Sequence, residues 1–171
     1  MHGRRSTVAL AAALLLTAAG AAQAIEVGQV EVRGLDEEMA ENVRVSLSLA
    51  DASGDDLSPR RLRYMLRTAE DEAREALEPF GYYSPDVQVE STRGNGRVNV
   101  VVTVDPGEPV RVRNSDVAII GPGNRDRYLA KDLADFGPAR GEVFDHRPYE
   151  AGKARISRRL AERGYFDADF S

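Results

Sequence analysis

The chain has 171 residues, a formal net charge of −5, no cysteine and no tryptophan. Without cysteine, disulfides, thiolate metal sites and cysteine nucleophiles are excluded, so core packing must hold the fold together. The acidic balance argues against a nucleic-acid-binding protein, which needs a clustered basic face. The length suits one ordinary domain or two small ones.

Residues 1–24 have the pattern of a secretory signal peptide. A basic start with two arginines is followed by an apolar run over residues 8–16, and Ala22-Gln23-Ala24 has the A-x-A form of a cleavage site. A membrane anchor is the alternative, but the run is short for a hydrocarbon core of about 30 Å. We therefore predict export, with Ile25 as the first residue of the mature chain.

Residues 25–105 are predicted to form one small α+β unit that begins with a strand and two helices. Alternating side chains over residues 25–33 predict a half-buried strand. Asp36 is a suitable N-cap for a first helix, and Ser58-Pro59 begins a second helix that runs to about Pro79. The apolar stripe expected on the second helix is Leu62, Leu66, Ala69, Ala73, Ala76, Leu77 and Phe80.

The end of this second helix, Leu77-Glu78-Pro79-Phe80-Gly81-Tyr82-Tyr83, has a pattern that recurs once later in the chain. Its apolar face stops at a glycine, which suits the left-handed residue that often ends a helix, and two aromatic residues lead into extended chain. Gly164, Tyr165 and Phe166 repeat the arrangement after Leu160. A turn used twice predicts two copies of one unit. We expect both aromatic pairs to pack the helix end onto a sheet, with stacking on a ligand as the alternative.

Two more strands complete the first unit. Residues 86–91 and 97–104 alternate between apolar and polar side chains, and the Asn95-Gly96 pair between them is a hairpin signal. The predicted order is therefore strand, helix, helix, strand, strand. Both helices should cover one face of the sheet, because each has a single apolar stripe to bury.

After a short linker, residues 106–109, we expect a second unit over residues 110–171. It should contain a strand over residues 110–120, helices near residues 128–136 and 148–163, and a strand over residues 165–170. The hairpin partner of the last strand is missing. The chain is then either a piece of a longer protein, which we favour, or marginally folded in this part.

These features resemble the POTRA domains of the Omp85 outer-membrane assembly family, most of all the N-terminal part of its TamA (translocation and assembly module) branch. The resemblance rests on the turn at Gly81, on Val104-Asp105-Pro106-Gly107-Glu108-Pro109-Val110, and on residues 149–168. It implies tandem β-α-α-β-β domains in the periplasm and a role in inserting or secreting autotransporters and other outer-membrane proteins. Implied partners are a TamB-like protein anchored in the inner membrane, outer-membrane protein clients, and a C-terminal barrel if the chain is a piece.

No catalytic, metal or cofactor site is predicted. His146, beside Asp145, has no serine in a nucleophile elbow to act on and is interpreted as a loop residue. The aspartates of residues 51–56 lack the spacing of a calcium loop. The arginines of the last helix are interpreted as a solvated face, with anionic lipid or a partner as the alternative: Arg155, Arg158, Arg159 and Arg163.

A binding mode is predicted at the edge of the first sheet. The family topology places the last strand of the unit in the middle, so Val87, Gln88, Val89 and Glu90 should lie on an edge strand that can pair with an extended peptide. An edge blunted by solvated side chains is the alternative. We expect proline at Gln88 to block pairing and spare the fold.

The predicted function is an exported interaction module of outer-membrane protein assembly. A stand-alone periplasmic envelope or division scaffold is the alternative. An enzyme would need a pocket of convergent titratable groups.

Overall fold

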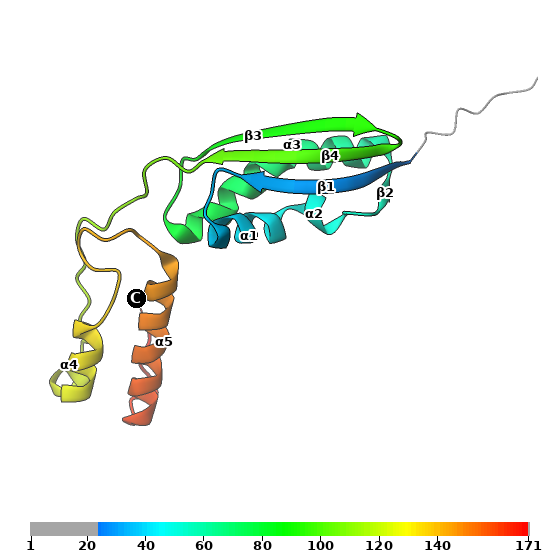
Figure 1. Cartoon of the computed structure of the whole chain (residues 1–171). Coiled ribbons are helices and arrows are strands. Elements are labelled where there is room, and N and C mark those ends of the chain that lie inside the picture. Colours follow the sequence, from blue (N-terminus) through cyan, green and yellow to red (C-terminus); the bar gives the residue numbers. More distant parts are fainter. Residues whose placement is uncertain (1–23, 171) are drawn as a thin grey trace, which may run out of the picture.

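The structure is a computed structural model that describes residues 24–170, so the predicted signal peptide, apart from Ala24, lies outside the described residues. A first part holds the sheet, and a second, helical part extends from one end of it (Figure 1). The elements of the first part are β1 (Ile25–Arg33), α1 (Glu37–Ser46), α2 (Ser48–Asp51), β2 (Asp56–Leu57), α3 (Pro59–Leu77), the 3-10 helix η1 (Glu78–Phe80), β3 (Asp86–Gly94) and β4 (Arg97–Asp105). The second part holds the 3-10 helix η2 (Pro122–Arg125), α4 (Arg127–Ala134) and α5 (His146–Glu162).

The strand order in the sheet is β2-β1-β4-β3. β1 runs parallel to β4, with an irregularity in register between Val27 and Val30, and β3 pairs with β4 in the antiparallel sense. Asn95 and Gly96, both with positive φ, form the predicted two-residue hairpin turn. The helices of the first part cover one face of the sheet (Figure 1). The predicted α+β class with helices on one face is confirmed.

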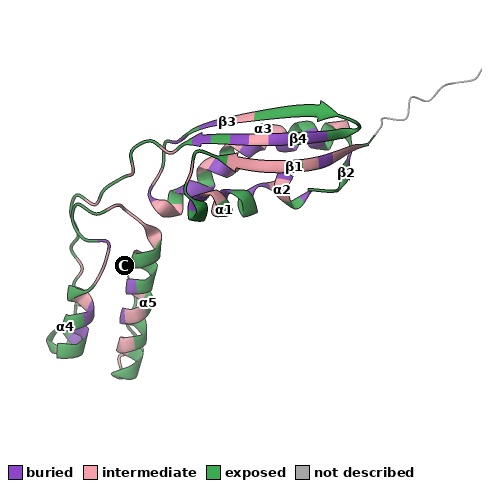
Figure 2. Cartoon of the chain, in the orientation of Figure 1, coloured by how far each residue is buried: buried purple, intermediate pink, exposed green. Residues whose placement is uncertain are grey.

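The hydrophobic core lies between this face and the helices (Figure 2). The inward valines of β4 alternate with exposed side chains along the strand, as a half-buried strand requires. The predicted stripe of α3 is largely confirmed, although Met65 is buried and Leu66 only partly so. The core residues with the largest fully buried side chains are Leu47, Leu49, Leu62, Leu77, Val27, Val43, Val98, Val100, Val102 and Val104.

Both predicted helix starts are confirmed by capping hydrogen bonds. The Met39 backbone N–H donates to Asp36 Oδ1 at 2.9 Å, and the Arg61 N–H donates to Ser58 Oγ at 3.3 Å. The first helix ends at Ser46, because Leu47 adopts an extended conformation. This break, followed by the short α2, lets Leu47 and Leu49 both reach the core.

The sequence analysis did not predict β2, because Asp56 and Leu57 lie in a polar segment that has the composition of a loop. Its two residues pair antiparallel with Ile25 and Glu26, and only Leu57 is buried. A strand of two residues has no periodicity to detect.

The strands expected in the second part do not form. Arg111 and Val143 make an isolated antiparallel bridge, and beyond Val112 residues 113–120 have no strand partner in the described part of the chain. Residues 165–170 are likewise irregular. Extended chain needs a neighbouring ladder to satisfy its backbone groups, and apolar content or position in a repeat does not supply one. The predicted helices are present as α4 and α5.

The arginines of α5 are not simply a solvated face. Arg159 Nε lies 2.9 Å from Asp132 Oδ2, and Arg163 Nε lies 2.8 Å from Asp126 Oδ2. Arg155 donates to the carbonyl oxygen of Asp135 at 2.7 Å, where α4 ends. The solvated-face prediction is therefore wrong for Arg155 and Arg159, which are half-buried because α5 turns them toward α4. Arg158 and Arg163 are exposed, as predicted, although Arg163 pairs with Asp126.

Few apolar side chains are buried in the second part. Leu129 on α4 and Ile156 on α5 are the buried hydrophobic side chains among its described residues. Across residues 24–170, the structure contains no helix with the length and apolar character to cross a bilayer.

Candidate functional site at the edge of the sheet

β3 is the outermost strand on one side of the sheet, so Val87, Gln88, Val89 and Glu90 lie on an edge strand. Val87 is buried and Val89 half-buried, whereas Gln88 and Glu90 are exposed. The two valines thus lie against the helices. No described segment pairs with the outer side of β3.

The register identifies which backbone groups face that open side. The Gly96 carbonyl oxygen accepts from the Glu26 N–H on β1 at 3.2 Å, so the Arg97 N–H, in the same peptide plane, points the opposite way toward β3. Pairs in an antiparallel ladder are hydrogen-bonded alternately, starting here from Gly94 and Arg97. The backbone groups that face outward therefore belong to Val87, Val89, Ser91 and Arg93.

The backbone groups of Gln88 face inward, toward β4. It lies opposite Thr103, and the alternation makes this a hydrogen-bonded pair. Contrary to the sequence-based expectation, proline at Gln88 would remove a β3–β4 hydrogen bond and would not spare the fold.

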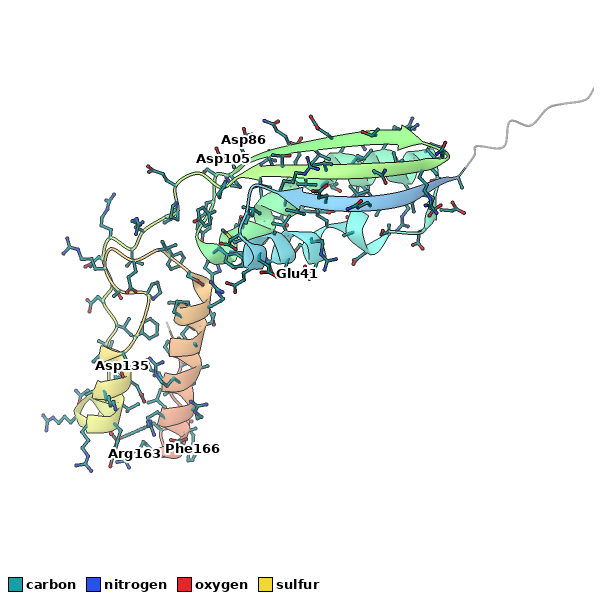
Figure 3. The ribbon with its side chains drawn as sticks, in the orientation of Figure 1. Glu41, Asp86, Asp105, Asp135, Arg163 and Phe166 are labelled. Carbon is teal, nitrogen blue, oxygen red and sulfur yellow. The ribbon has the colours of Figure 1, made fainter. Side chains whose placement is uncertain are left out.

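The edge is long and carries few of the features that blunt edges. β3 has nine residues with no proline, and a long open edge is a template for pairing with another chain. Asp86 and Asp105 lie directly opposite each other at the end nearest the second part (Figure 3). Like charges in this position weaken a pair, so we expect this end of β3 to be the looser one.

The turn at Gly81 joins the sheet to the second part. Gly81 has a φ of 87°, as predicted for a left-handed helix end, and its carbonyl oxygen accepts from the Val110 N–H at 2.8 Å. A Cβ atom at this position would lie 2.9 Å from the Phe144 carbonyl oxygen and 2.9 Å from Val143 Cγ1. Glycine is therefore required here for close approach as well as for backbone conformation.

The two residues of the first aromatic pair, Tyr82 and Tyr83, make different contacts. Tyr82 packs against the core, as predicted, whereas the Tyr83 hydroxyl lies 2.7 Å from His146 Nε2. His146 is the first residue of α5, whose N-cap is Asp145, so its assignment to a loop is wrong. The sequence contains no local signal for a contact between residues so far apart.

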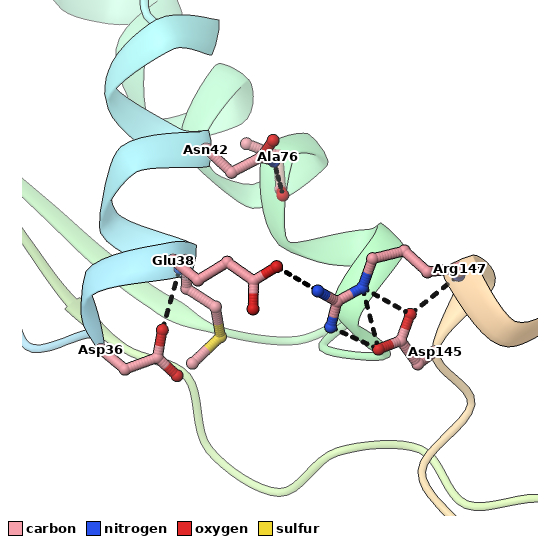
Figure 4. Close-up of polar contacts among 7 residues, drawn as sticks. Asp36, Glu38, Asn42, Ala76, Asp145 and Arg147 are labelled. Atoms are coloured by element: carbon pink, nitrogen blue, oxygen red, sulfur yellow. Dashed lines mark hydrogen bonds and ion pairs between the residues drawn. The ribbon is translucent and has the colours of Figure 1, made fainter.

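Arg147 completes the joint between the two parts (Figure 4). Its guanidinium contacts the carboxylates of Asp145 and Glu38, the latter on α1, and lies 4.8 Å from the centre of the Phe80 ring. The hydrogen bond from Arg147 lowers the pKa of Asp145, with burial opposing the shift. The contact with Glu38 ties α5 to the sheet-bearing part.

The second turn is built differently. Gly164 has a φ of 85°, but no atom lies within 4 Å of the place a Cβ would take. Tyr165 is half-buried and Phe166 is 80% exposed at the end of α5 far from the sheet (Figure 3). The prediction that this pair packs onto a sheet is wrong, because no sheet forms beside it in the described residues.

A four-stranded sheet with helices on one face and an open edge strand defines a small α+β domain whose outermost strand is free to pair with added extended chain. Residues 29–106 match the family model described as POTRA domain, TamA domain 1. This part of the chain is therefore a POTRA domain.

Several solved structures are similar to the chain. One is the crystal structure of Haemophilus influenzae BamA POTRA3-5, at 18% identity, 85% coverage of this chain, 52% coverage of that chain and a TM-score of 0.39. Another is POTRA1-2 of the periplasmic domain of Omp85 from Anabaena, at 18% identity, with 85% and 84% coverage and a TM-score of 0.39. The Anabaena POTRA1-3 structure gives 19% identity, 86% and 55% coverage and a TM-score of 0.41. The chain spans about half the length of the BamA structure.

Proposed function

We propose that this protein is a periplasmic interaction module of an outer-membrane protein and autotransporter assembly complex, comparable to the N-terminal part of TamA. The match of residues 29–106 to the first POTRA domain of TamA supports this assignment. Residues 1–24 are its proposed signal peptide and residues 25–105 its first domain. Residues 106–109 form the linker, and residues 110–171 are part of a second domain.

The observation that carries the proposal is the outer edge of β3. Four residues of this strand direct their backbone N–H and C=O groups away from the sheet: Val87, Val89, Ser91 and Arg93. Pairing through the backbone needs little side-chain identity, which suits a module that receives many unfolded outer-membrane clients. A TamB-like protein, anchored in the inner membrane, is the proposed stable partner.

The test is a proline at an outward-facing, exposed position. Ser91 is exposed and its N–H points away from β4, so Ser91→Pro should remove a pairing group at little cost to the fold. Ser91→Ala is the matched control, because it shortens the side chain and keeps the N–H.

The probe is a synthetic ten-residue peptide with the alternating apolar and polar residues of a membrane barrel strand. In ¹⁵N NMR titrations we expect it to shift the amide signals of Val87, Val89 and Ser91 in the wild-type chain, and those of the two valines in Ser91→Ala. Ser91→Pro should melt near the wild-type temperature and show no such shifts at the valines. Peptide-induced shifts that persist in Ser91→Pro, or are absent from the wild type, would contradict the proposal.

A further inference from the structure

A groove lies between β1 and α1, on the side of the sheet away from β3. Its wall on the strand side is formed by Val30, Glu31 and Val32, and its volume is about 750 Å³. The residues of α1 that line it are Glu37, Glu38, Ala40, Glu41 and Arg44. Figure 1 shows α1 beside the outer side of β1, well separated from β3.

The outer side of β1 is open along this groove. β2 pairs only with Ile25 and Glu26, and Val27 bonds to residues 54 and 55. From Val30 onward, no described strand lies on this side of β1.

The parallel register shows which groups of β1 face the groove. In β4, the odd-numbered residues from Arg97 bond to β3, so the even-numbered residues face β1. In a parallel ladder, a residue whose backbone groups face the neighbouring strand bonds to the two residues that flank its opposite residue on that strand. Glu31 lies opposite Val101 and therefore directs its groups inward, as does Arg33 opposite Thr103.

Val30 and Val32 consequently direct their N–H and C=O groups into the groove. These groups have no backbone partner in the part of the chain that the structure describes. They have the spacing that an added strand requires, since hydrogen-bonding groups on one side of a strand recur every second residue. The half-buried side chains of Val30, Val32 and Ala40 add apolar surface.

The acidic lining of the groove favours extended chains that carry positive charge. Four glutamates and Arg44 line the groove. Two of these glutamates already contact an arginine on other elements or on α1, Glu38 with Arg147 and Glu41 with Arg44 at 2.6 Å. The Arg33–Glu31 pair, at 2.8 Å, is also solvent-exposed, and Glu37 makes no ion pair within residues 24–170. Exposed pairs of this kind contribute little stability and can exchange partners. An incoming cation would therefore meet the carboxylate of Glu37 without an ion pair in the described residues, beside three carboxylates held only in exposed pairs.

We infer that this groove binds an extended basic segment of a partner protein, which adds as a strand to residues 30–32 of β1. Side chains of a strand point alternately to its two faces, so lysine or arginine at every second position would meet Glu37 and Glu41 on α1. The inference concerns the edge of β1 and its acidic lining, whereas the proposed function depends on the edge of β3. The two therefore stand independently.

The probes are two amidated octapeptides, one alternating lysine with valine and one alternating glutamate with valine. With the purified chain, we expect the lysine peptide to shift the amide signals of Val30 and Val32 in ¹⁵N NMR spectra and the glutamate peptide to leave them in place. The double variant Glu37→Gln/Glu41→Gln should weaken lysine-peptide binding about tenfold, as loss of two partly screened ion pairs predicts.

Two controls separate this groove from other causes. Glu70→Gln/Asp71→Asn removes the same charge from α3, where both residues pair with Arg74, and should leave binding unchanged. Ser91→Pro should also leave it unchanged, so a failure of the β3 proposal would be visible separately. The inference is overturned if the glutamate peptide binds equally well, if the Glu37→Gln/Glu41→Gln variant binds as the wild type does, or if the shifts fall on β3. Self-association of the chain through these same amides would identify a second copy as the occupant and would also overturn it.

Discussion

Replacing Gly81 by alanine tests whether this turn holds the two parts of the protein together. The substitution acts in two ways. A non-glycine residue in the left-handed conformation costs roughly 1–2 kcal/mol, and Gly81 has a φ of 87°. The new Cβ would also lie 2.9 Å from the Phe144 carbonyl oxygen, so the backbone at residues 143–144 must move.

The steric cost of the new Cβ can be separated from the conformational cost of the left-handed backbone. Gly54 has the same φ of 87° in the same part of the protein, but nothing lies within 4 Å of its hypothetical Cβ. Gly54→Ala should therefore cost only the conformational term, about 1–2 kcal/mol. Gly81→Ala should cost roughly 1 kcal/mol more, because displacing the second part weakens the hydrogen bond from Val110 to Gly81.

Urea unfolding followed by circular dichroism gives the free energies of the two variants, and ¹⁵N NMR locates the disturbance. We expect Gly81→Ala to shift the amide signals of residues 143–147 and Gly54→Ala to leave them unchanged. Equal free-energy costs together with unmoved signals at residues 143–147 would refute the argument, since the close approach at Gly81 would then have no energetic consequence.

Two further predictions concern the second part and its joint. Gly152→Ala should destabilise the packing of α4 on α5 by about 1–3 kcal/mol, because its Cβ would lie 2.8 Å from Phe136 Cδ2. This loss should exceed the gain from the better helix propensity of alanine. A melting temperature above that of the wild type would contradict this prediction. Because Arg147 holds the pKa of Asp145 below its ordinary value, the pair stabilises the fold above about pH 4, and this contribution is lost as the pH falls through the lowered pKa. In Arg147→Gln, NMR titration should show the Asp145 pKa raised toward its ordinary value; an unchanged pKa would exclude the guanidinium as the cause.

The predictions that depended on short-range signals agree with the structure. Asp36 and Ser58 cap the two helices of the first part, Asn95-Gly96 turns the hairpin, and Gly81 ends α3 in the left-handed region. Each signal depends on hydrogen bonds or backbone angles within a few residues, so the local sequence is sufficient to specify it. The single apolar stripe of each helix similarly required both helices to lie on one face of the sheet.

The tertiary structure decided everything that requires a partner distant in the sequence. The apolar residues within 110–120 and the position of residues 165–170 after the repeated glycine turn indicated strands, yet neither signal provides the neighbouring ladder that a strand needs, and these segments have none in the described residues. The contacts of Arg147 with Glu38 and of Tyr83 with His146 join segments separated by 109 and 63 positions. The outward direction of the Ser91 N–H likewise follows from the register with β4. The sequence therefore determined the local conformation and the fold class. Which edges remain open, and which charges meet, depended on the folded arrangement, because these energies arise only when distant segments come together.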